Sequence, residues 1–227
     1  MRVAFIGEGN IDEVLIPPLI TTLAKTNHIN WPIDFSNDIR RPFGRGFGGV
    51  TSTVRDIIAA LKVAPVTIKK QYQYFIVLID GRGTSVSQAE IQKMIEGHEE
   101  FVYGIAIKEV EAWVLADRDH LIEWLGIEKK GFPTCRFWDN GYQPESDPDP
   151  KRTLSELLQA SEHEFDVWCV GAAEDFIEKY CKGTDFTDAR INMDNWQGNA
   201  NLLLMAQKCP KGFRPFKEAI LRMLGKK

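Results

Sequence analysis

Short apolar runs alternate along the chain with longer stretches in which apolar residues recur at helical spacing. A short, continuous apolar run bounded by turn residues predicts a buried β-strand. We expect such strands at 3–6, 74–79 and 101–107, and a looser strand within 28–35 that Pro32 restricts to a sheet edge. The helices expected from the spacing cover 12–25, 51–63, 85–97, 108–125, 150–158, 170–182, 198–207 and 213–224.

Proline and capping residues refine the ends of these helices. Pro17 and Pro18 interrupt the first helical stretch, which is therefore expected to be kinked or to start late. The expected N-caps are Ser52 or Thr53, Ser85 or Ser87, and Asp149, which precedes Pro150 as the first helical residue.

The alternation of strands and helices in the first half predicts an α/β fold. Strand, helix, strand, helix at this spacing favours an open, mostly parallel sheet flanked by helices, with right-handed crossovers. From residue 128 onward the pattern is mainly helical. We therefore expect a single domain over 1–227, with an α/β core at 1–127 and a helical C-terminal layer at 128–227.

Composition adds limits on partners and location. The net charge of −4 and the 44% hydrophobic content are ordinary for a globular protein. No apolar run approaches membrane-spanning length and the chain runs at once into a strand, so we expect a cytoplasmic protein with no membrane partner. The four scattered cysteines are expected to be reduced thiols.

Charge is unevenly distributed along the chain. Residues 208–227 contain seven Lys and Arg against one acid, so that this segment carries +6 and residues 1–207 carry −10. Such a basic end is typical of a solvated terminal helix, and it would also allow contact with phosphates.

Acidic residues follow three of the predicted strands. Glu8 lies in a Gly-Glu-Gly turn after the first strand, Asp80 ends the strand at 74–79, and Glu109 and Glu111 follow the strand at 101–107. Parallel strand order would bring these carboxylates to one edge of the sheet, where they repel one another unless a cation neutralises them. Hard oxygen ligands suit Mg²⁺ or Mn²⁺. The alternative is that each acid only caps the helix that follows it.

Periodicity leaves the choice between Glu109 and Glu111 open. In a helix the two side chains would lie about 200° apart, whereas in an extended junction they would face the same side. Trp113 in the same segment is expected to be a core residue.

Basic residues form two candidate contacts with a nucleic acid. In the Gly-rich stretch 40–49, Arg40, Arg41 and Arg45 suit phosphates, while its phenylalanines suit base stacking; a plain surface loop is the alternative. Lys151 would lie in the first turn of its helix and either reaches the acidic site or is an ordinary surface lysine.

The ordered motifs together are similar to a known family. Gly7-Glu8-Gly9 with Asp12-Glu13, the strand ending in Asp80, and Glu111-Ala112-Trp113-Val114-Leu115-Ala116-Asp117 resemble the Toprim domain of topoisomerases, primases and overcoming-lysogenisation-type nucleases. More specifically, they resemble a bacterial Toprim-like family known as domain of unknown function 4276. The stretches Pro144-Glu145…Pro150-Lys151 and Cys209-Pro210…Phe213…Phe216 also match that family.

The resemblance implies a Toprim-like, metal-dependent nuclease or phosphotransfer protein that acts on nucleic acid. Glu8, Asp80 and Glu111 would be catalytic, and Asp117 would join them as a possible ligand of Mg²⁺ or Mn²⁺. By analogy it also implies a role in anti-phage or mobile-element defence, beside an ATPase partner.

One departure from the Toprim pattern concerns Arg82. It stands where these domains usually carry a second acid, and it suits a bidentate phosphate contact instead. A catalytically inactive binding module and a small-molecule phosphohydrolase or nucleotide-binding protein are therefore the alternative functions.

Overall fold

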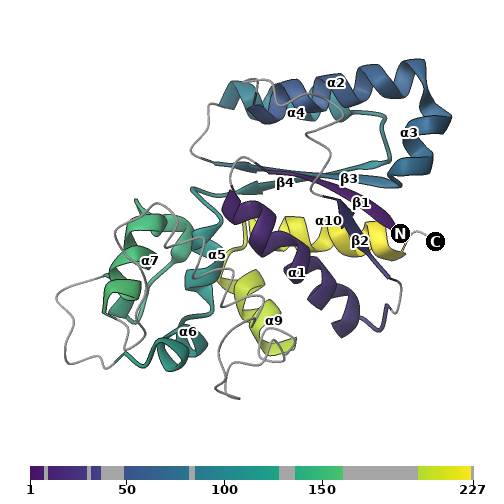
Figure 1. The fold of residues 1–227 in the computed structure, drawn as a ribbon. Helices are drawn as coiled ribbons and strands as arrows, with labels where there is room; N and C mark the ends of the chain where they lie inside the picture. Colours follow the sequence, from purple (N-terminus) through teal and green to yellow (C-terminus); the bar gives the residue numbers. More distant parts are fainter. Residues whose placement is uncertain are drawn as a thin grey trace.

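The computed structural model describes residues 1–7, 10–29, 32–36, 49–81, 85–127, 136–160 and 199–225. Its centre is a four-stranded sheet, drawn nearly edge-on in Figure 1. The strands are β1 (Arg2–Ile6), β2 (Asp34–Ser36), β3 (Tyr74–Asp80) and β4 (Phe101–Ala106). They lie in the order β2-β1-β3-β4, and all three pairings are parallel. The predicted α/β fold with a parallel sheet is confirmed.

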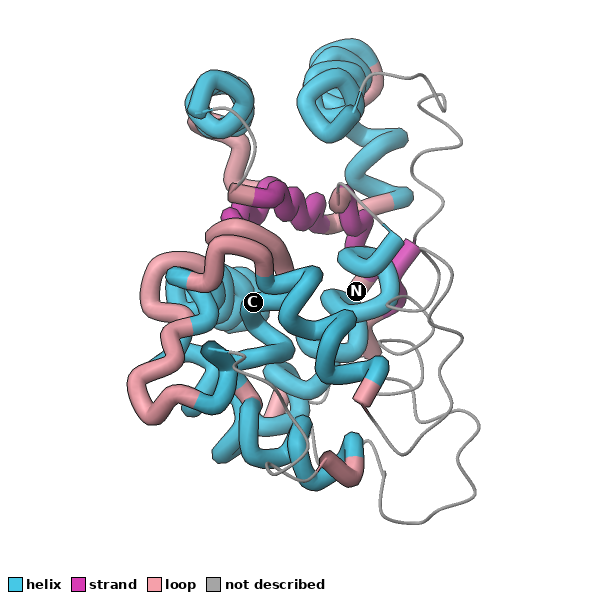
Figure 2. The backbone as a smooth tube through the Cα atoms, turned by 90° about the vertical axis from the view of Figure 1, so that its left-hand side faces the viewer, coloured by secondary structure: helices cyan, strands magenta, loops and turns pink. Residues whose placement is uncertain are grey.

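Helices cover both faces of the sheet (Figures 1 and 2). One face carries α2 (Gly49–Val63), α3 (Pro65–Gln71) and α4 (Ser85–Ile95). The opposite face carries α1 (Asn10–Thr26) and α10 (Phe213–Gly225). Beyond the carboxyl ends of the strands lie α5 (Glu111–Ala116), α6 (Arg118–Leu125), α7 (Pro150–Gln159), α9 (Asn199–Lys208) and two 3₁₀ turns, η3 (Arg136–Trp138) and η4 (Pro144–Ser146).

Side-chain alternation along the strands divides the core into two layers. In β1, Val3 and Phe5 pack with α1 and α10, whereas Ala4 and Ile6 pack with α2. Because both faces are covered, β1 and β3 are apolar at nearly every position, as a parallel sheet requires.

The first helix differs from its prediction. It starts at Asn10 and includes Pro17 and Pro18 within its bounds, so the expected late start is wrong. The apolar side chains Ile16, Leu19 and Leu23 are fully buried against the sheet. Their burial offsets the backbone hydrogen bonds that the prolines cannot make, a case in which tertiary packing overrides local propensity.

Other bounds also need correction. The second strand is only Asp34–Ser36 and lies at a sheet edge, as Pro32 indicated. Ser52 and Thr53 lie inside α2, where each hydroxyl donates to the Gly49 carbonyl, so neither is its N-cap. Ser85 and Ser87 both lie within α4, and α3 was not predicted.

The helix expected at 108–125 is broken at Asp117. Its backbone leaves the helical region (φ −88°, ψ 47°), and α6 starts at the next residue. The predicted helices at 150–158, 198–207 and 213–224 correspond to α7, α9 and α10 and are confirmed. The one at 170–182 lies outside the described residues.

The C-terminal helix α10 completes the core on its face of the sheet. A Cβ added to Gly104 of β4 would lie 2.4 Å from the ring of Phe216, so this ring rests directly on the strand. Phe216 also stacks on Trp113, with 5.4 Å between ring centroids. None of the described helices is both long and apolar enough to cross a membrane.

Candidate functional site at the carboxyl ends of the strands

The strand order places a topological switch point between β1 and β3. The chain leaves β1 along α1 on one face, whereas it leaves β3 along α4 on the other. In open α/β sheets, ligands bind in the crevice that this divergence opens at the carboxyl ends of the strands. The crevice here is bordered by Gly7 and Asp80.

Close packing at the end of β1 brings a carboxylate to this point. A Cβ on Gly7 would lie 2.6 Å from the Cβ of Asp12 and 2.8 Å from its Oδ2. Only glycine therefore fits at position 7. Asp12, in the first turn of α1, is buried with 4% of its surface exposed.

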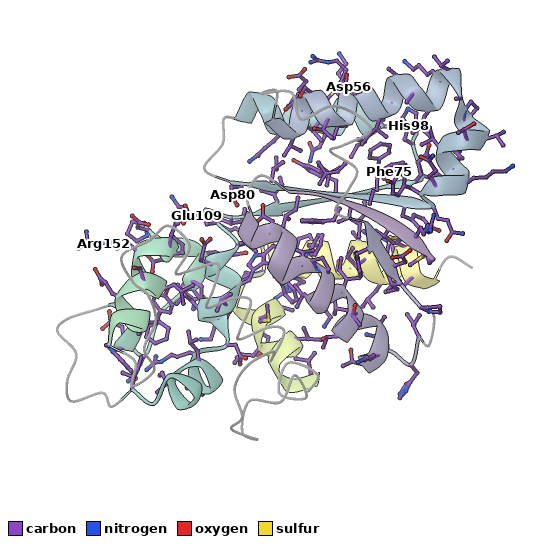
Figure 3. All side chains as sticks on the ribbon, in the orientation of Figure 1. Asp56, Phe75, Asp80, His98, Glu109 and Arg152 are labelled. Carbon is purple, nitrogen blue, oxygen red and sulfur yellow. The ribbon has the colours of Figure 1, made fainter. Side chains whose placement is uncertain are left out.

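Close packing around a glycine also joins the ends of β3 and β4. Asp80 pairs in register with Ala106, and the Gly81 N–H donates to the Ala106 carbonyl at 2.6 Å. A Cβ on Gly81 would meet the backbone of Ile107 and Lys108 at 3.1 and 3.0 Å. Asp80 and Glu109 accordingly lie at the same end of the sheet (Figure 3).

Both Glu109 and Glu111 belong to this region. Glu109 precedes α5 in a non-helical junction and Glu111 is its first helical residue, and both are buried. The charge of Glu109 acts on Glu111, so the two carboxylates lie near each other. The turn between them therefore brings both residues to the site.

Burial, together with smaller contributions from the nearby charges of Glu109 and Asp12, raises the pKa of Glu111 to about 7. A hydrogen bond from its own backbone and the charge of Lys151 act in the opposite direction. Carboxylates from α1 and from the β4–α5 junction are thus electrostatically coupled, and Glu111 exchanges a proton near neutral pH.

The N-terminus of α7 points at the same carboxylates. The Lys151 N–H donates to Glu109 Oε2 at 3.2 Å. Asp149 Oδ1 accepts the Arg152 N–H at 3.2 Å, so the predicted N-cap at Asp149 and first helical residue at Pro150 are confirmed. The N-terminus of α7 therefore donates to a carboxylate of the β4–α5 junction, as helix N-termini commonly bind anionic groups.

Asp117 lies at the other end of α5. Six residues at 1.5 Å each separate it from Glu111 by about 9 Å along the helix axis. It is fully buried where α5 meets α6. Its role as a metal ligand stays a prediction.

Glu145 links two late stretches of the chain. Its carboxylate accepts the Lys211 N–H at 3.0 Å and the Gly212 N–H at 2.5 Å, at the start of α10. A Cβ on Gly212 would also meet the Ile105 carbonyl at 3.0 Å. The segments 144–151 and 209–216 therefore pack together against β4 and α5.

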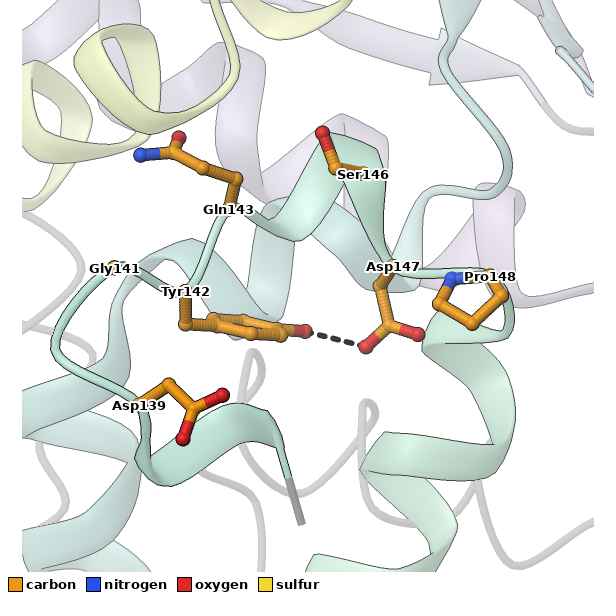
Figure 4. A pocket seen from close by; sticks show the side chains of 7 residues that line it. All are labelled: Asp139, Gly141, Tyr142, Gln143, Ser146, Asp147 and Pro148. Atoms are coloured by element: carbon orange, nitrogen blue, oxygen red, sulfur yellow. Dashed lines mark hydrogen bonds between the residues drawn. The ribbon is translucent and has the colours of Figure 1, made fainter.

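A cavity of about 320 Å³ lies beside η4 and is lined by residues 139–148 (Figure 4). Its buried acid, Asp147, accepts hydrogen bonds from the Tyr142 and Thr153 hydroxyls at 2.7 and 2.8 Å and from the Asp149 N–H at 2.9 Å. These bonds anchor the loop that leads into α7, so we assign this carboxylate a structural role.

The donors at the strand ends fit a hydrated Mg²⁺ or Mn²⁺. Carboxylate oxygens are hard ligands, and Mg²⁺ is commonly held by one or two of them together with waters and phosphates. Within the described residues, no three acid, histidine or cysteine side chains are arranged to enclose a metal ion. A metal site at the strand ends therefore stays a prediction.

Several predicted site residues lie outside the described part of the chain. They are Glu8, Arg40, Arg41, Arg45 and Arg82. Lys151 is described and exposed at the start of α7.

Sequence reasoning did not include Asp12 among the site residues and left Glu109 as an alternative. The signal for Asp12 was its place in the first turn of the helix after Gly-Glu-Gly. The signal for Glu109 was its spacing from the end of the strand. Only the turn at Lys108 shows that this spacing brings Glu109 to the site.

Comparison with protein-family models, with curated proteins and with solved structures finds no match to this chain.

Proposed function

We propose that the protein is a divalent-metal-dependent, Toprim-like nuclease or phosphotransfer protein acting on nucleic acid. The observation that carries this proposal is the gathering of Asp12, Asp80, Glu109 and Glu111 at the switch point of a parallel sheet. These acids come from three separate segments of the chain. They are buried or half-buried although they repel one another, which a bound cation would offset.

The chain's own groups have distinct roles in this proposal. Glu8 and Asp80 would hold the ion, which when bound polarises a phosphate and activates water. Glu111 exchanges a proton near neutral pH and suits general acid or base work. Arg82 and the arginines of the 40–49 stretch would position the phosphate backbone.

A cleavage assay tests the proposal. Single- and double-stranded DNA and RNA are incubated with Mg²⁺ or Mn²⁺ and with wild type, Glu8→Gln or Asp80→Asn. We expect cleavage by wild type and a loss of about 100-fold or more in both variants.

Asp34→Asn is the matched control, because Asp34 is exposed at the start of β2 and, within the described residues, its carboxylate pairs with Arg2. It should cleave like wild type. Full activity in Asp80→Asn would contradict the site assignment.

An inactive nucleic-acid-binding module is the second candidate. It is favoured by Arg82, which replaces an expected ligand with a phosphate-binding group. In that case wild type would bind the oligonucleotides without metal and cut none of them.

A further inference from the structure

Lys108 lies in an unusual turn between β4 and α5. Its φ is +68°, and the Glu109 N–H donates to the Ile107 carbonyl at 3.1 Å, which closes a three-residue γ-turn around it. The γ-turn with positive φ is rare and strained. Glycine would adopt it without steric cost, whereas a lysine side chain does not favour it.

The other non-glycine residue with positive φ has an ordinary explanation. His28 (φ 57°) ends α1, where the Ile29 N–H donates to the Ala24 carbonyl, and helices commonly end with one left-handed residue. Lys108 ends no helix. Its strain lies instead at the edge of the candidate site, beside Gly81, and strained residues concentrate at functional sites.

Lys108 is also a cation at the edge of the candidate site. Among the described residues, no carboxylate lies within 4.0 Å of its ammonium group, although Glu109 is its neighbour in sequence. The exposed side chain of Lys151 likewise makes no ion pair within that part of the chain. Neither ammonium group is therefore neutralised by a carboxylate of the described residues.

Glu109 holds the backbones of these two lysines close together. It follows Lys108 directly, and its carboxylate accepts the Lys151 N–H. The backbones of the two lysines thus flank Glu109, one in the β4–α5 junction and the other in the first turn of α7. A phosphate that approaches Asp80 and Glu111 would be repelled by them, and nearby cations reduce this repulsion.

We propose that Lys108 and Lys151 contact backbone phosphates of a nucleic acid that crosses the acidic crevice, with Glu109 as the residue that positions both. This inference rests on the proposed function and assigns the binding contacts to it. Lysine at position 108 then provides charge at a position where glycine would be more stable.

Oligonucleotide binding in EDTA tests the inference without cleavage. Fluorescence anisotropy is measured with single- and double-stranded DNA and RNA between about 50 and 200 mM salt. For Lys108→Gln and for Lys151→Gln we expect affinity to fall roughly tenfold at the lowest salt. The slope of log affinity against log salt should decrease by about 0.9 on duplex DNA and about 0.7 on single strands.

Two further variants separate charge from backbone strain. Lys108→Gly should bind as weakly as Lys108→Gln yet melt at a higher temperature than wild type, because the turn is relieved. Lys108→Arg should retain wild-type affinity. Lys70→Gln, an exposed lysine at α3 on the far side of the sheet, is the control and should bind like wild type.

The outcomes distinguish this inference from the function on which it rests. If wild type binds nucleic acid while Lys108→Gln and Lys108→Gly keep its affinity and salt slope, the inference is overturned and the proposed function stands. If wild type binds none of the four oligonucleotides in EDTA, the inference is overturned, and the cleavage assay with Mg²⁺ or Mn²⁺ still decides the proposed function.

Discussion

At the scale of single residues, Glu111 is the clearest sign that this fold is not optimised for stability alone. Its side chain is 4% exposed and lies beside Glu109 and Asp12, so folding disfavours its ionised form. An apolar residue at this position would avoid the cost of burying one carboxylate beside two others. The presence of Glu111 there therefore favours a chemical role.

The pKa of Glu111 predicts how stability depends on pH. Below about 4.5, Glu111 is protonated in both the folded and unfolded states, and above about 7 it is ionised in both. Between these values only the folded state holds the proton, so the free energy of unfolding falls as pH rises, by about 3 kcal/mol in total.

Glu111→Gln removes this titration. Urea unfolding in EDTA at a series of pH values should show the variant gaining about 3 kcal/mol on wild type between pH 4.5 and 7. A constant difference between the two proteins across that range would refute the assignment.

At the scale of elements, short turns and caps determine where the site residues lie. The γ-turn at Lys108 brings Glu109 and Glu111 to one place, and the N-terminus of α7 binds Glu109. Glu145 performs the corresponding task for α10 by accepting two backbone N–H groups. The contacts of Glu109 with α7 and of Glu145 with α10 join elements that are far apart in sequence.

Glu145→Ala should therefore destabilise the protein strongly. It leaves two backbone N–H groups near the start of α10 without their acceptor, at a cost of about 3 kcal/mol in the free energy of unfolding. Glu145→Gln retains one carbonyl oxygen and should lose about half as much. Chemical denaturation measures both, with Gln143→Ala in the same loop as an exposed control; equal stability of all three variants would show that Glu145 does not cap α10.

At the scale of the whole molecule, the C-terminal helices belong to the core of the sheet. Phe213 and Phe216 of α10 enclose Trp113 at 5.3 and 5.4 Å between ring centroids, and Phe216 rests on Gly104. The Cys209 thiol in the same region donates to the Ala112 carbonyl at 3.6 Å, and burial raises its pKa. Residues late in the sequence thus pack against β4 and α5, which carry part of the candidate site.

Phe216→Ala is expected to destabilise the α/β core and not only its own helix. A cavity between Trp113 and β4 should cost about 3 to 5 kcal/mol. Unfolding of the variant should remain a single transition when tryptophan fluorescence and far-ultraviolet circular dichroism are compared. Leu203→Ala, a half-exposed position on α9, should change stability by less than about 0.5 kcal/mol. Two separate transitions in Phe216→Ala would contradict a shared core.

Much of the fold could be predicted from local pattern. Strands buried on both faces must be continuously apolar, so β1, β3 and β4 are visible in the sequence, and the cap of α7 follows from Asp149 and Pro150. Where local pattern and packing conflict, prediction failed: α1 includes two prolines because its apolar face covers the sheet, and Asp117 divides a stretch that was predicted as one helix.

The candidate site likewise combines features that the sequence predicts with features that only packing sets. The sequence by itself determined that Asp80 and the acids after β4 follow strand ends, because the end of an apolar run is a local feature. Only the tertiary structure decided that Asp12 lies against Gly7, that Glu109 and Glu111 share one region, and that Lys108 and Lys151 flank Glu109. These contacts join residues up to 42 positions apart in the case of Glu109 and Lys151. Packing between elements and the strand order set these contacts, which the residue pattern within any single element does not encode.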